Sequence, residues 1–405
     1  MGLTLEERTG QGSKLSDVRN AVDAAHNSTG LINGSPADWW VIVLADGDNM
    51  GQFVSGKKLE KYERYVQRDA LDESALTGDV LDRFLQQTTK RMGPATHVGL
   101  NRALLDFSNR LVPYLTERRF CGRVIYSGGD DVMAVLPLED LPGYLCSLRS
   151  AWSGQPDPDG EFEAAGGYWR PKSDRAKKSL PNRPWFTMGE TATMSVGVVI
   201  AHKSVPLPTV LESLWDAESK QAKGMPGKNG LCFRVLYGNG NQLEALMSGS
   251  GSADEAASLN GEKQATDLFS RWWDWVGRYE DYGDKLSPVL YRLSEELPKR
   301  AAVGDRLLAK AAQVIVNRRD SAEDLAVVNH ALVIWIEQWE NWAIAARSHP
   351  TQSNLGTESA DLGKLLRFSA FWIDKRVERL GWANAGRAMA KTTTKTTEEG
   401  PNVLV

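Results

Sequence analysis

The sequence predicts an α+β domain followed by an all-α helical bundle. Before about residue 246, apolar runs rich in β-branched residues alternate with stretches of helical period. A Gly- and Ser-rich break follows at 247–261, and the chain beyond it keeps a helical period. Eight of the fourteen tryptophans lie in that second part, at the spacing of a buried helical core.

Composition excludes several classes of protein. The chain has 405 residues and a net charge of −4, so whole-chain electrostatics does not indicate nucleic-acid binding. It shows neither a signal-peptide pattern nor an apolar run long enough to cross a bilayer. Its three cysteines form no CxxC pair, which argues against a zinc knuckle or a disulfide framework. We therefore expect a cytoplasmic protein that makes no membrane contact.

The first domain is expected at 37–246, after a polar segment at 1–36 that is typical of a flexible leader. Its first strand is the apolar run at 39–45, whose pattern predicts burial on both faces. Asp46 and Asp48 end this run at spacing two, so both are expected to project from one face.

A β-hairpin is the next clear element. Residues 96–119 have the apolar spacing of a helix, and strands are predicted at 122–127 and 131–137. The Gly-Gly-Asp-Asp sequence at 128–131 connects them. A turn explains the two glycines, whereas two adjacent aspartates repel each other and need another reason to be there.

The rest of the first domain alternates between helix and strand. A helix is expected after the hairpin, a strand at 192–202, a helix beyond it and a last strand that ends near 237. This order predicts helices on one face of a mainly antiparallel sheet. Residues 153–186 are predicted to be an insertion loop. Within this loop, residues 170–183 carry six cations and one acid, Asp174. The cations are Arg170, Lys172, Arg175, Lys177, Lys178 and Arg183.

The second domain is predicted at 262–390 as a helical bundle. Residues 391–405, rich in Thr and Lys, are predicted to be a flexible tail.

Four carboxylates meet if the first strand lies beside the hairpin: Asp46, Asp48, Asp130 and Asp131. Carboxylates with no accompanying His or Cys suit Mg²⁺ or Mn²⁺. Two such ions can activate a hydroxyl and stabilise the leaving oxygen of a phosphoryl displacement. We therefore predict a two-metal site.

A nucleotide site is predicted beside these acids. Gly128 and Gly129, preceded by Ser127, allow close approach of a ligand to the backbone. Asn49 and Gly51 begin a helix whose N–H groups suit phosphates. Three lysines can reach the outer phosphates: Lys220, Lys223 and Lys228.

Structural explanations exist for each of these residues. Gly-Gly-Asp also makes an ordinary hairpin turn, and Asp131 can simply face solvent. Asp48 or Asn49 can cap the helix that follows them. The lysines can form a solvated helix end, and the basic stretch at 170–183 can be a disordered loop.

Four stretches, taken in order, resemble one family. They are LADGDNMGQFVSG (44–56), VGLNRALLDFSNRLVP (98–113), YSGGDDVMAVLPLEDL (126–141) and TMSVGVVIAHKSVPLPTVLESLWDAESKQAKGMPGKNG (193–230). They resemble the second Palm domain of the large subunit of type III CRISPR effector complexes, particularly of the Cmr branch. The later helical part is similar in position and character only.

The resemblance implies a ferredoxin-like Palm related to polymerases and to GGDEF and adenylyl cyclases. It also implies that target RNA binding makes the complex convert ATP into cyclic oligoadenylates. The matching positions make Asp130 and Asp131 the GGDD acids and Asp46 the strand-end metal ligand. Gly128 and Gly129 would lie at the nucleotide. The partners implied are other type III effector subunits, with guide and target RNA contacted indirectly or through the helical domain.

The chain departs from the family in three ways. It lacks the HD nuclease domain and the first Palm that usually precede this region, so we do not expect single-stranded DNA cleavage. It also lacks the usual zinc-binding cysteines. Joining two ATP molecules needs a second nucleotide site, which must come from a first-Palm partner chain or from a second copy.

Two other functions remain open on the sequence. The chain can be a non-catalytic scaffold subunit of an RNA-guided complex. It can also be a stand-alone homodimeric cyclase that makes a cyclic dinucleotide.

Overall fold

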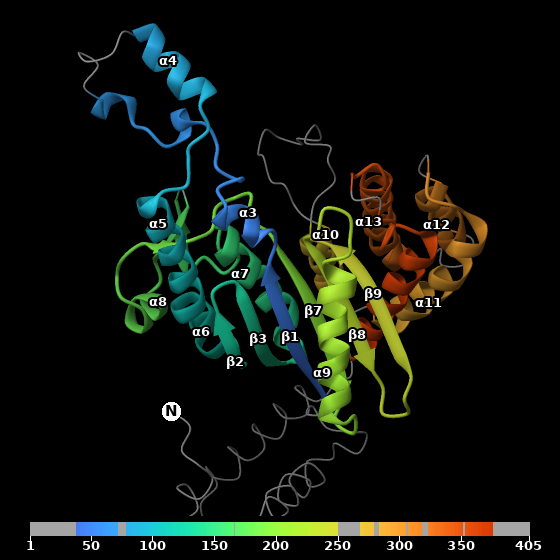
Figure 1. The fold of residues 1–405 in the computed structure, drawn as a ribbon. Helices are drawn as coiled ribbons and strands as arrows, with labels where there is room; N and C mark the ends of the chain where they lie inside the picture. The colour runs from blue at the N-terminus through green and yellow to red at the C-terminus, as the bar shows by residue number, and fades with distance from the viewer. Residues whose placement is uncertain are drawn as a thin grey trace, which may run out of the picture.

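A six-stranded sheet is the centre of the molecule (Figure 1). The computed structural model describes residues 38–71, 78–165, 167–249, 268–278, 283–304, 307–317, 323–350 and 353–375. The predicted leader at 1–36 and tail at 391–405 lie outside these residues. No helix in the described part of the chain is both long and apolar enough to span a membrane.

The sheet has the strand order β2-β3-β1-β7-β8-β9. Its strands are β1 (Trp39–Gly47), β2 (Arg123–Gly128), β3 (Asp131–Pro137), β7 (Met194–His202), β8 (Gly230–Leu236) and β9 (Gln242–Ser248). Every neighbouring pair is antiparallel except β7 and β8. The predicted mainly antiparallel sheet is thus confirmed.

Helices connect these strands and cover the sheet. The α-helices of this part are α3 (Met50–Val54), α4 (Gly78–Gln87), α5 (Pro94–Asp106), α6 (Val112–Tyr114), α7 (Leu141–Ser153), α8 (Asp174–Ser179) and α9 (Leu207–Asp216). Wider π-helical turns are η5 (Phe107–Leu111), η6 (Leu115–Arg119) and η8 (Ala217–Ala222), and 3-10 turns are η2 (Tyr62–Arg64), η3 (Arg68–Ala70) and η7 (Leu138–Asp140).

The prediction that helices lie on one face of the sheet is wrong. Val41 and Val43 of β1 face the large core formed with α7 and its neighbours, whereas Ile42 faces Val210 and Leu214 of α9. Helix α9 carries the crossover between the parallel strands β7 and β8, and such a connection must pass over one face of the sheet. The central strand is consequently buried on both faces, as its continuous apolar run predicts.

The predicted loop at 153–186 is instead a small folded unit. It contains a second, three-stranded sheet of β4 (Phe162–Ala164), β5 (Tyr168–Pro171) and β6 (Trp185–Phe186), together with α8. Strands of two to four residues are too short to produce a readable alternation. Buried Trp169 and Trp185 join this unit to the main core.

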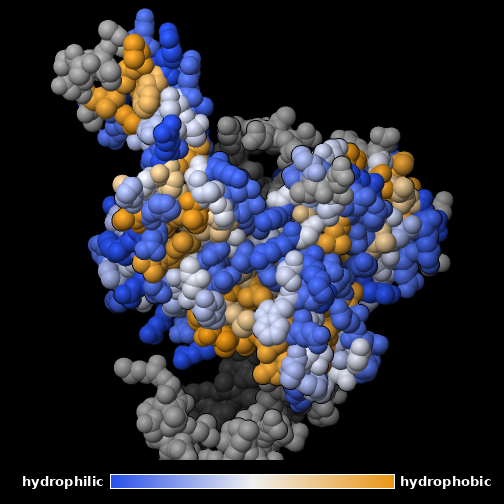
Figure 2. All heavy atoms as spheres, viewed as in Figure 1, coloured by the Kyte–Doolittle hydropathy of each residue, from blue (hydrophilic) through white to orange (hydrophobic). Residues whose placement is uncertain are grey.

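The described residues between α3 and α5, at 55–71 and 78–93, form an arm that projects from the body, with α4 at its far end (Figure 1). The ring of Phe84 stacks on Tyr62 at 4.9 Å. Figure 2 shows hydrophobic residues at the surface of this arm, among them Val80 and Phe84.

The C-terminal part is helical, as predicted. It consists of α10 (Leu268–Arg278), α11 (Gly283–Arg300), α12 (Leu307–Asn317), α13 (Glu323–Arg347) and a helix at 359–375. The described residues therefore cover the predicted 262–390 bundle only in part. The last strand, β9, ends at Ser248, whereas the sequence predicts no strand beyond 237.

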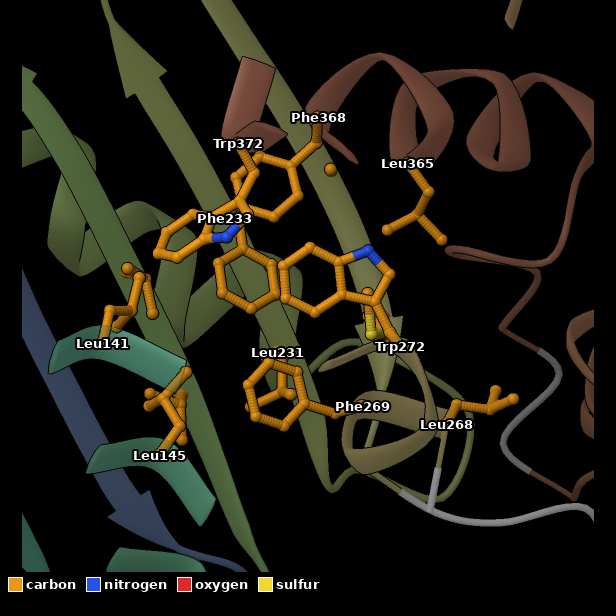
Figure 3. Packing of buried hydrophobic residues seen from close by; sticks show 14 of the residues in the cluster. Leu141, Leu145, Leu231, Phe233, Leu268, Phe269, Trp272, Leu365, Phe368 and Trp372 are labelled. Carbon is orange, nitrogen blue, oxygen red and sulfur yellow. The ribbon is translucent and has the colours of Figure 1, made fainter. Parts of the chain in front are cut away.

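Aromatic side chains join the helical part to the sheet (Figure 3). Phe233 of β8 lies 4.7 Å from Phe368, 6.0 Å from Phe269 and 6.4 Å from Trp272, measured between ring centroids. These residues belong to the same buried cluster as the core beneath β1. The two predicted domains therefore share one hydrophobic core.

Candidate functional site

The end of β1 lies beside the hairpin of β2 and β3. Ala45 pairs with Val132, and Gly128 pairs with Asp131 across the turn. Gly129 has a φ of 64°, a left-handed conformation that suits glycine. This register brings Asp46 next to Asp131, at the same edge of the sheet.

Gly47 brings Asp130 close to the end of β1. A Cβ atom on residue 47 would lie 2.5 Å from the Trp152 ring and 2.9 Å from the Asp130 Cβ. The Trp152 indole is itself fixed, because its N–H donates to the Thr193 carbonyl at 3.0 Å. The sequence prediction that Asp46, Asp130 and Asp131 converge therefore agrees with this geometry.

Burial and mutual repulsion change the proton affinity of these acids. Burial, a hydrogen bond to the Asp46 carboxylate and the charges of Asp46 and Asp130 raise the pKa of Asp131 to about 7. Burial and the charge of Asp46 also raise the pKa of Asp130. The cluster would be stabilised by added positive charge.

Lys223 supplies part of that charge. Its Nζ lies 3.0 Å from Asp46 Oδ2 and 2.6 Å from Glu218 Oε1. Although burial opposes it, these two hydrogen bonds raise the pKa of Lys223. Burial raises the pKa of Glu218, and the nearby Lys223 works against that shift.

The π-helical turn η8 places Glu218 and Lys223 side by side. The Lys223 N–H donates to the Glu218 carbonyl, a five-residue spacing that an α-helix does not make. Gly197 of β7 lets this turn approach, because a Cβ there would lie 2.7 Å from the Glu218 nitrogen. The close contact between η8 and the sheet sets the position of both side chains.

Asp48 lies apart from the cluster and is only 2% exposed. Its Oδ1 accepts from Ser195 Oγ at 2.7 Å, and its Oδ2 accepts from Thr193 Oγ1 at 2.8 Å and from the Asn229 N–H at 2.9 Å. Hydrogen-bond donors of the protein thus already contact both oxygens of the Asp48 carboxylate, which lies just after the end of β1 at Gly47.

The alternative prediction, that the side chain of Asp48 or Asn49 caps the next helix, is wrong. Asn49 precedes α3 in a left-handed conformation, and no side chain caps that helix. Asp48 is instead a structural link between the end of β1, strand β7 and the loop before β8.

The predicted nucleotide-binding residues are only partly assembled. Ser127 donates its hydroxyl to the Ser108 carbonyl at 2.9 Å. Gly128 has the Tyr126 hydroxyl 2.4 Å from the position of a Cβ, so a larger residue there would require the exposed Tyr126 ring to move. Gly51 is exposed with open space around it.

The three lysines separate. Lys223 enters the site, Lys220 pairs with Asp216 at 2.6 Å, and Lys228 is half-buried in the left-handed turn before β8. Only one of the three therefore contacts the predicted acids directly.

The loop that follows Lys223 rests on the helical part of the chain. Ser353 Oγ donates to the Gly224 carbonyl at 2.7 Å. A Cβ on Gly227 would lie 3.5 Å from the His349 ring. The segment before the helix at 359–375 thus supports the loop between Lys223 and Asn229.

Sequence reasoning missed Glu218, Thr193 and Ser195. The partners of Asp48 lie 145 or more positions away along the chain. Glu218 is visible as an acid five residues before Lys223, but that spacing points to proximity only once a π-helical turn is known.

The donor chemistry of the cluster fits a hard divalent cation, since Asp46, Asp130 and Asp131 offer only carboxylate oxygens. Within the described residues, however, no three His, Cys, Asp or Glu side chains are gathered closely enough to hold a metal ion as they stand. Lys223 occupies one side of the cluster instead. Holding a metal ion between these carboxylates would therefore require other side-chain positions than those of the structure.

Comparison with known proteins confirms the resemblance seen in the sequence. Residues 40–159 match the family described as the second palm domain of Cas10/Cmr2. The chain is 26% identical over 234 residues to the CRISPR system Cmr subunit Cmr2 of Pyrococcus furiosus, an alignment that covers 58% of this chain and 22% of that protein. It is 28% identical over 192 residues to the Cmr2 subunit of Saccharolobus solfataricus, covering 47% of this chain and 16% of that protein.

Two solved structures are also similar to this chain. A chain of the Type III-B Cmr-beta complex bound to cognate target RNA gives a TM-score of 0.49 at 15% identity, covering 84% of this chain and 42% of the other. A chain of the apo complex gives 0.42 at 15% identity, covering 78% and 35%. The chain thus spans about a fifth of the length of its curated relatives and less than half of these solved chains.

Proposed function

We propose, starting from the Cas10/Cmr2 second palm domain at residues 40–159, that this chain is the catalytic Palm of a type III RNA-guided complex. In this proposal the Palm joins ATP molecules into cyclic oligoadenylates after target RNA binds. The observation that carries the proposal is the meeting of Asp46 with the Gly-Gly-Asp-Asp turn at one edge of the sheet.

The reaction joins the ribose 3′ oxygen of one ATP to the α-phosphorus of another. The bond from that phosphorus to the bridging oxygen breaks, and pyrophosphate leaves. Such a displacement is accelerated mainly by positioning and by neutralising the charge that develops on the phosphate oxygens.

Asp46, Asp130 and Asp131 would hold Mg²⁺ or Mn²⁺, which supplies the positive charge that phosphoryl transfer requires. The raised pKa of Asp131 means that cation binding must displace a proton near neutral pH. Lys223 pairs with Asp46 until then.

Gly128 and Gly129 would let a nucleotide approach the hairpin backbone. Asn49 and Gly51 follow the end of β1, and Lys228 precedes the start of β8 at the same edge of the sheet. In this proposal these three residues contact the triphosphate. Ser127 would position the turn through its bond to the Ser108 carbonyl.

The second nucleotide would be contributed by another Palm, from a partner chain or a second copy. The relatives are subunits of Cmr complexes, and one similar structure is described as bound to cognate target RNA. We extend to this chain the same partners: the other subunits of a type III complex, with guide and target RNA.

The test is product analysis after incubation with each nucleoside triphosphate and Mn²⁺, with and without the assembled complex and target RNA. We expect pyrophosphate and cyclic adenylates from ATP. Asp130→Ala combined with Asp131→Ala should remove both products, whereas the exposed Glu212→Ala on α9 should not. Unchanged turnover in the double variant would disprove catalysis at this site.

A scaffold role is the second candidate, and one observation favours it. Lys223 already pairs with Asp46, and no metal cage is gathered among the described residues. A scaffold predicts that the double variant assembles normally and that ATP binds no more tightly with Mg²⁺ than without it. Isothermal titration of the chain with ATP, with and without Mg²⁺, separates the two roles.

A further inference from the structure

The small sheet of β4, β5 and β6 has two different faces. Phe162, Trp169 and Trp185 are buried against the main core. Because side chains alternate along a strand, the residues between them point the other way. The outer face carries Glu163, Tyr168, Arg170 and Phe186, and it covers no part of the main core.

Two aromatic rings lie on this outer face. Tyr168 of β5 and Phe186 of β6 are direct cross-strand partners, so their side chains are neighbours on one surface. Phe186 is 48% exposed. A flat surface of exposed rings on a sheet suits the stacking of unpaired nucleic-acid bases.

Cations surround the two rings. The Arg170 guanidinium lies 6.0 Å from the centroid of the Tyr168 ring, and Lys172 continues the same alternation beyond the strand. Lys177 and Lys178 follow in the last turn of α8. In Figure 2, hydrophilic residues cover the corner of the molecule at which α8 lies.

These charges are largely uncompensated. Among the described residues, no ion pair is formed by Lys172, Lys177 or Lys178, and all three are exposed. Arg175 reaches Glu161 only at 3.8 Å. The acids of this surface are Glu163, opposite Arg170, and Asp174 at the start of α8. The surface is therefore basic on a chain whose net charge is −4.

The face is also held rigidly from below. Arg183 lies over the Trp185 ring at 3.5 Å and makes two bonds to the Asp106 carboxylate, at 2.7 Å and 2.9 Å. The Phe186 N–H donates to the same carboxylate at 3.1 Å. A rigid platform loses little conformational entropy when a ligand binds.

We propose that this outer face, made of Tyr168, Arg170, Lys172, Phe186 and the lysines of α8, binds single-stranded nucleic acid. The lysines contact the phosphates, and bases stack on Phe186 and Tyr168. An acidic protein would use the charges but has no comparable use for the exposed Phe186 ring and the half-buried Tyr168 ring beside it. The inference goes beyond the proposed catalysis and does not require it.

The experiment measures fluorescence anisotropy of labelled oligonucleotides of about 12 nucleotides with the full chain. A uridine strand, a thymidine strand and a duplex are compared. We expect both single strands to bind more tightly than the duplex, and any additional preference for RNA identifies a contact to the 2′-hydroxyl. An acidic peptide that competes as well as the single strands would overturn the assignment.

Two kinds of variant separate stacking from charge. Phe186→Ala should weaken binding about tenfold while leaving its salt dependence unchanged. Lys177→Glu with Lys178→Glu should weaken binding and reduce the slope of log Kd against log salt by roughly 1 to 2. Because the two lysines are exposed, this variant keeps its fold, which circular dichroism checks.

Matched controls exist elsewhere on the chain. Phe84 on α4 is 46% exposed and Lys310 on α12 is exposed, so Phe84→Ala and Lys310→Glu should not change binding. Equal effects of the controls and the platform variants would overturn the proposal. The shift in thermal midpoint with Mn²⁺ needs no nucleic acid and should be the same in the platform variants as in the wild type. This readout distinguishes a failure of the platform proposal from a failure of the proposed catalytic site.

Discussion

Two carboxylates at the end of β1, Asp46 and Asp48, are two residues apart and have opposite environments. Asp48 is buried, and three donors satisfy its oxygens. Asp46 lies among the carboxylates of Asp130 and Asp131, with Lys223 as its cation. The Asp48 carboxylate has hydrogen-bond donors on both oxygens, whereas the carboxylates around Asp46 would be stabilised by further positive charge. Identical residues at a strand end can thus be structural or reactive, depending on what the rest of the fold brings to them.

The difference has a simple electrostatic cause. Hydroxyl and amide donors stabilise a buried carboxylate without adding a net charge that a ligand would have to displace. Carboxylates that face each other lack such donors and raise one another's proton affinity, as the pKa of Asp131 shows. The Asp48 carboxylate is therefore expected to stabilise the fold, whereas the Asp46 cluster is where we propose that a cation binds.

The largest predicted effect is on Asp48. Asp48→Ala leaves the Thr193 hydroxyl, the Ser195 hydroxyl and the Asn229 N–H without their acceptor, which should cost about 3 kcal/mol of unfolding free energy. Urea unfolding followed by tryptophan fluorescence measures this. Glu212→Ala, an exposed acid on α9, should stay within about 0.5 kcal/mol of the wild type. If Asp48→Ala loses no more unfolding free energy than the control, Asp48 does not have the structural role that we assign to it.

The next effect is stabilisation by Mn²⁺. A cation that binds only the folded cluster should add about 2.7 kcal/mol when its concentration is 100 times its Kd. The shift in thermal midpoint with Mn²⁺ concentration measures this. Asp46→Asn with Asp131→Asn should abolish the shift. Persistence of the shift in this variant would place the cation elsewhere.

Removing one of the repelling carboxylates should itself stabilise the fold. Asp131→Asn keeps the shape of the side chain and removes a charge next to Asp46 and Asp130, for a gain of about 1 kcal/mol at pH 8. Urea unfolding at pH 8 measures the difference. Destabilisation by this substitution would mean that the Asp131 charge is already compensated.

The same group predicts a pH dependence. The pKa of Asp131 is about 7 in the folded chain against an ordinary value near 3.8. Between these values the folded state keeps a proton that the unfolded chain has lost. The stabilisation that the bound proton of Asp131 provides is therefore complete below the unfolded pKa of 3.8, and it is lost as the pH rises through the folded pKa of about 7. The urea midpoint as a function of pH should show this fall in the wild type and not in Asp131→Asn.

The smallest effect concerns the support of the site loop. Ser353→Ala removes the bond to the Gly224 carbonyl and should cost about 0.5 kcal/mol. Because this loop leads from Lys223 to Asn229, the apparent Kd for Mn²⁺ should also change. Ser294→Ala, which loses a bond to the Tyr291 carbonyl within α11, is the control and should leave the Mn²⁺ Kd unchanged.

Local pattern predicted much of the fold. The first strand, the hairpin and the helical second part follow from alternation and turn chemistry over short stretches. The meeting of Asp46 with Asp131 also depends on the long-range pairing of β1 with β3, which the prediction from sequence had to assume. The unit at 153–186 did not follow, because its strands are shorter than the window in which a period can be read. Helix α9 was expected, but the face that it covers depends on the β7–β8 pairing, which alternation alone does not specify.

By itself, the sequence determined which residues can carry the chemistry: a strand that ends in acids, and a glycine turn that presents two more. The tertiary structure decided which of them is free to do so. Asp48 is satisfied by residues from two distant segments, and Lys223 reaches Asp46 only because a π-helical turn packs on Gly197. Hydrogen bonds and charges act over a few ångströms in space, so residues far apart in the sequence set the role of each carboxylate.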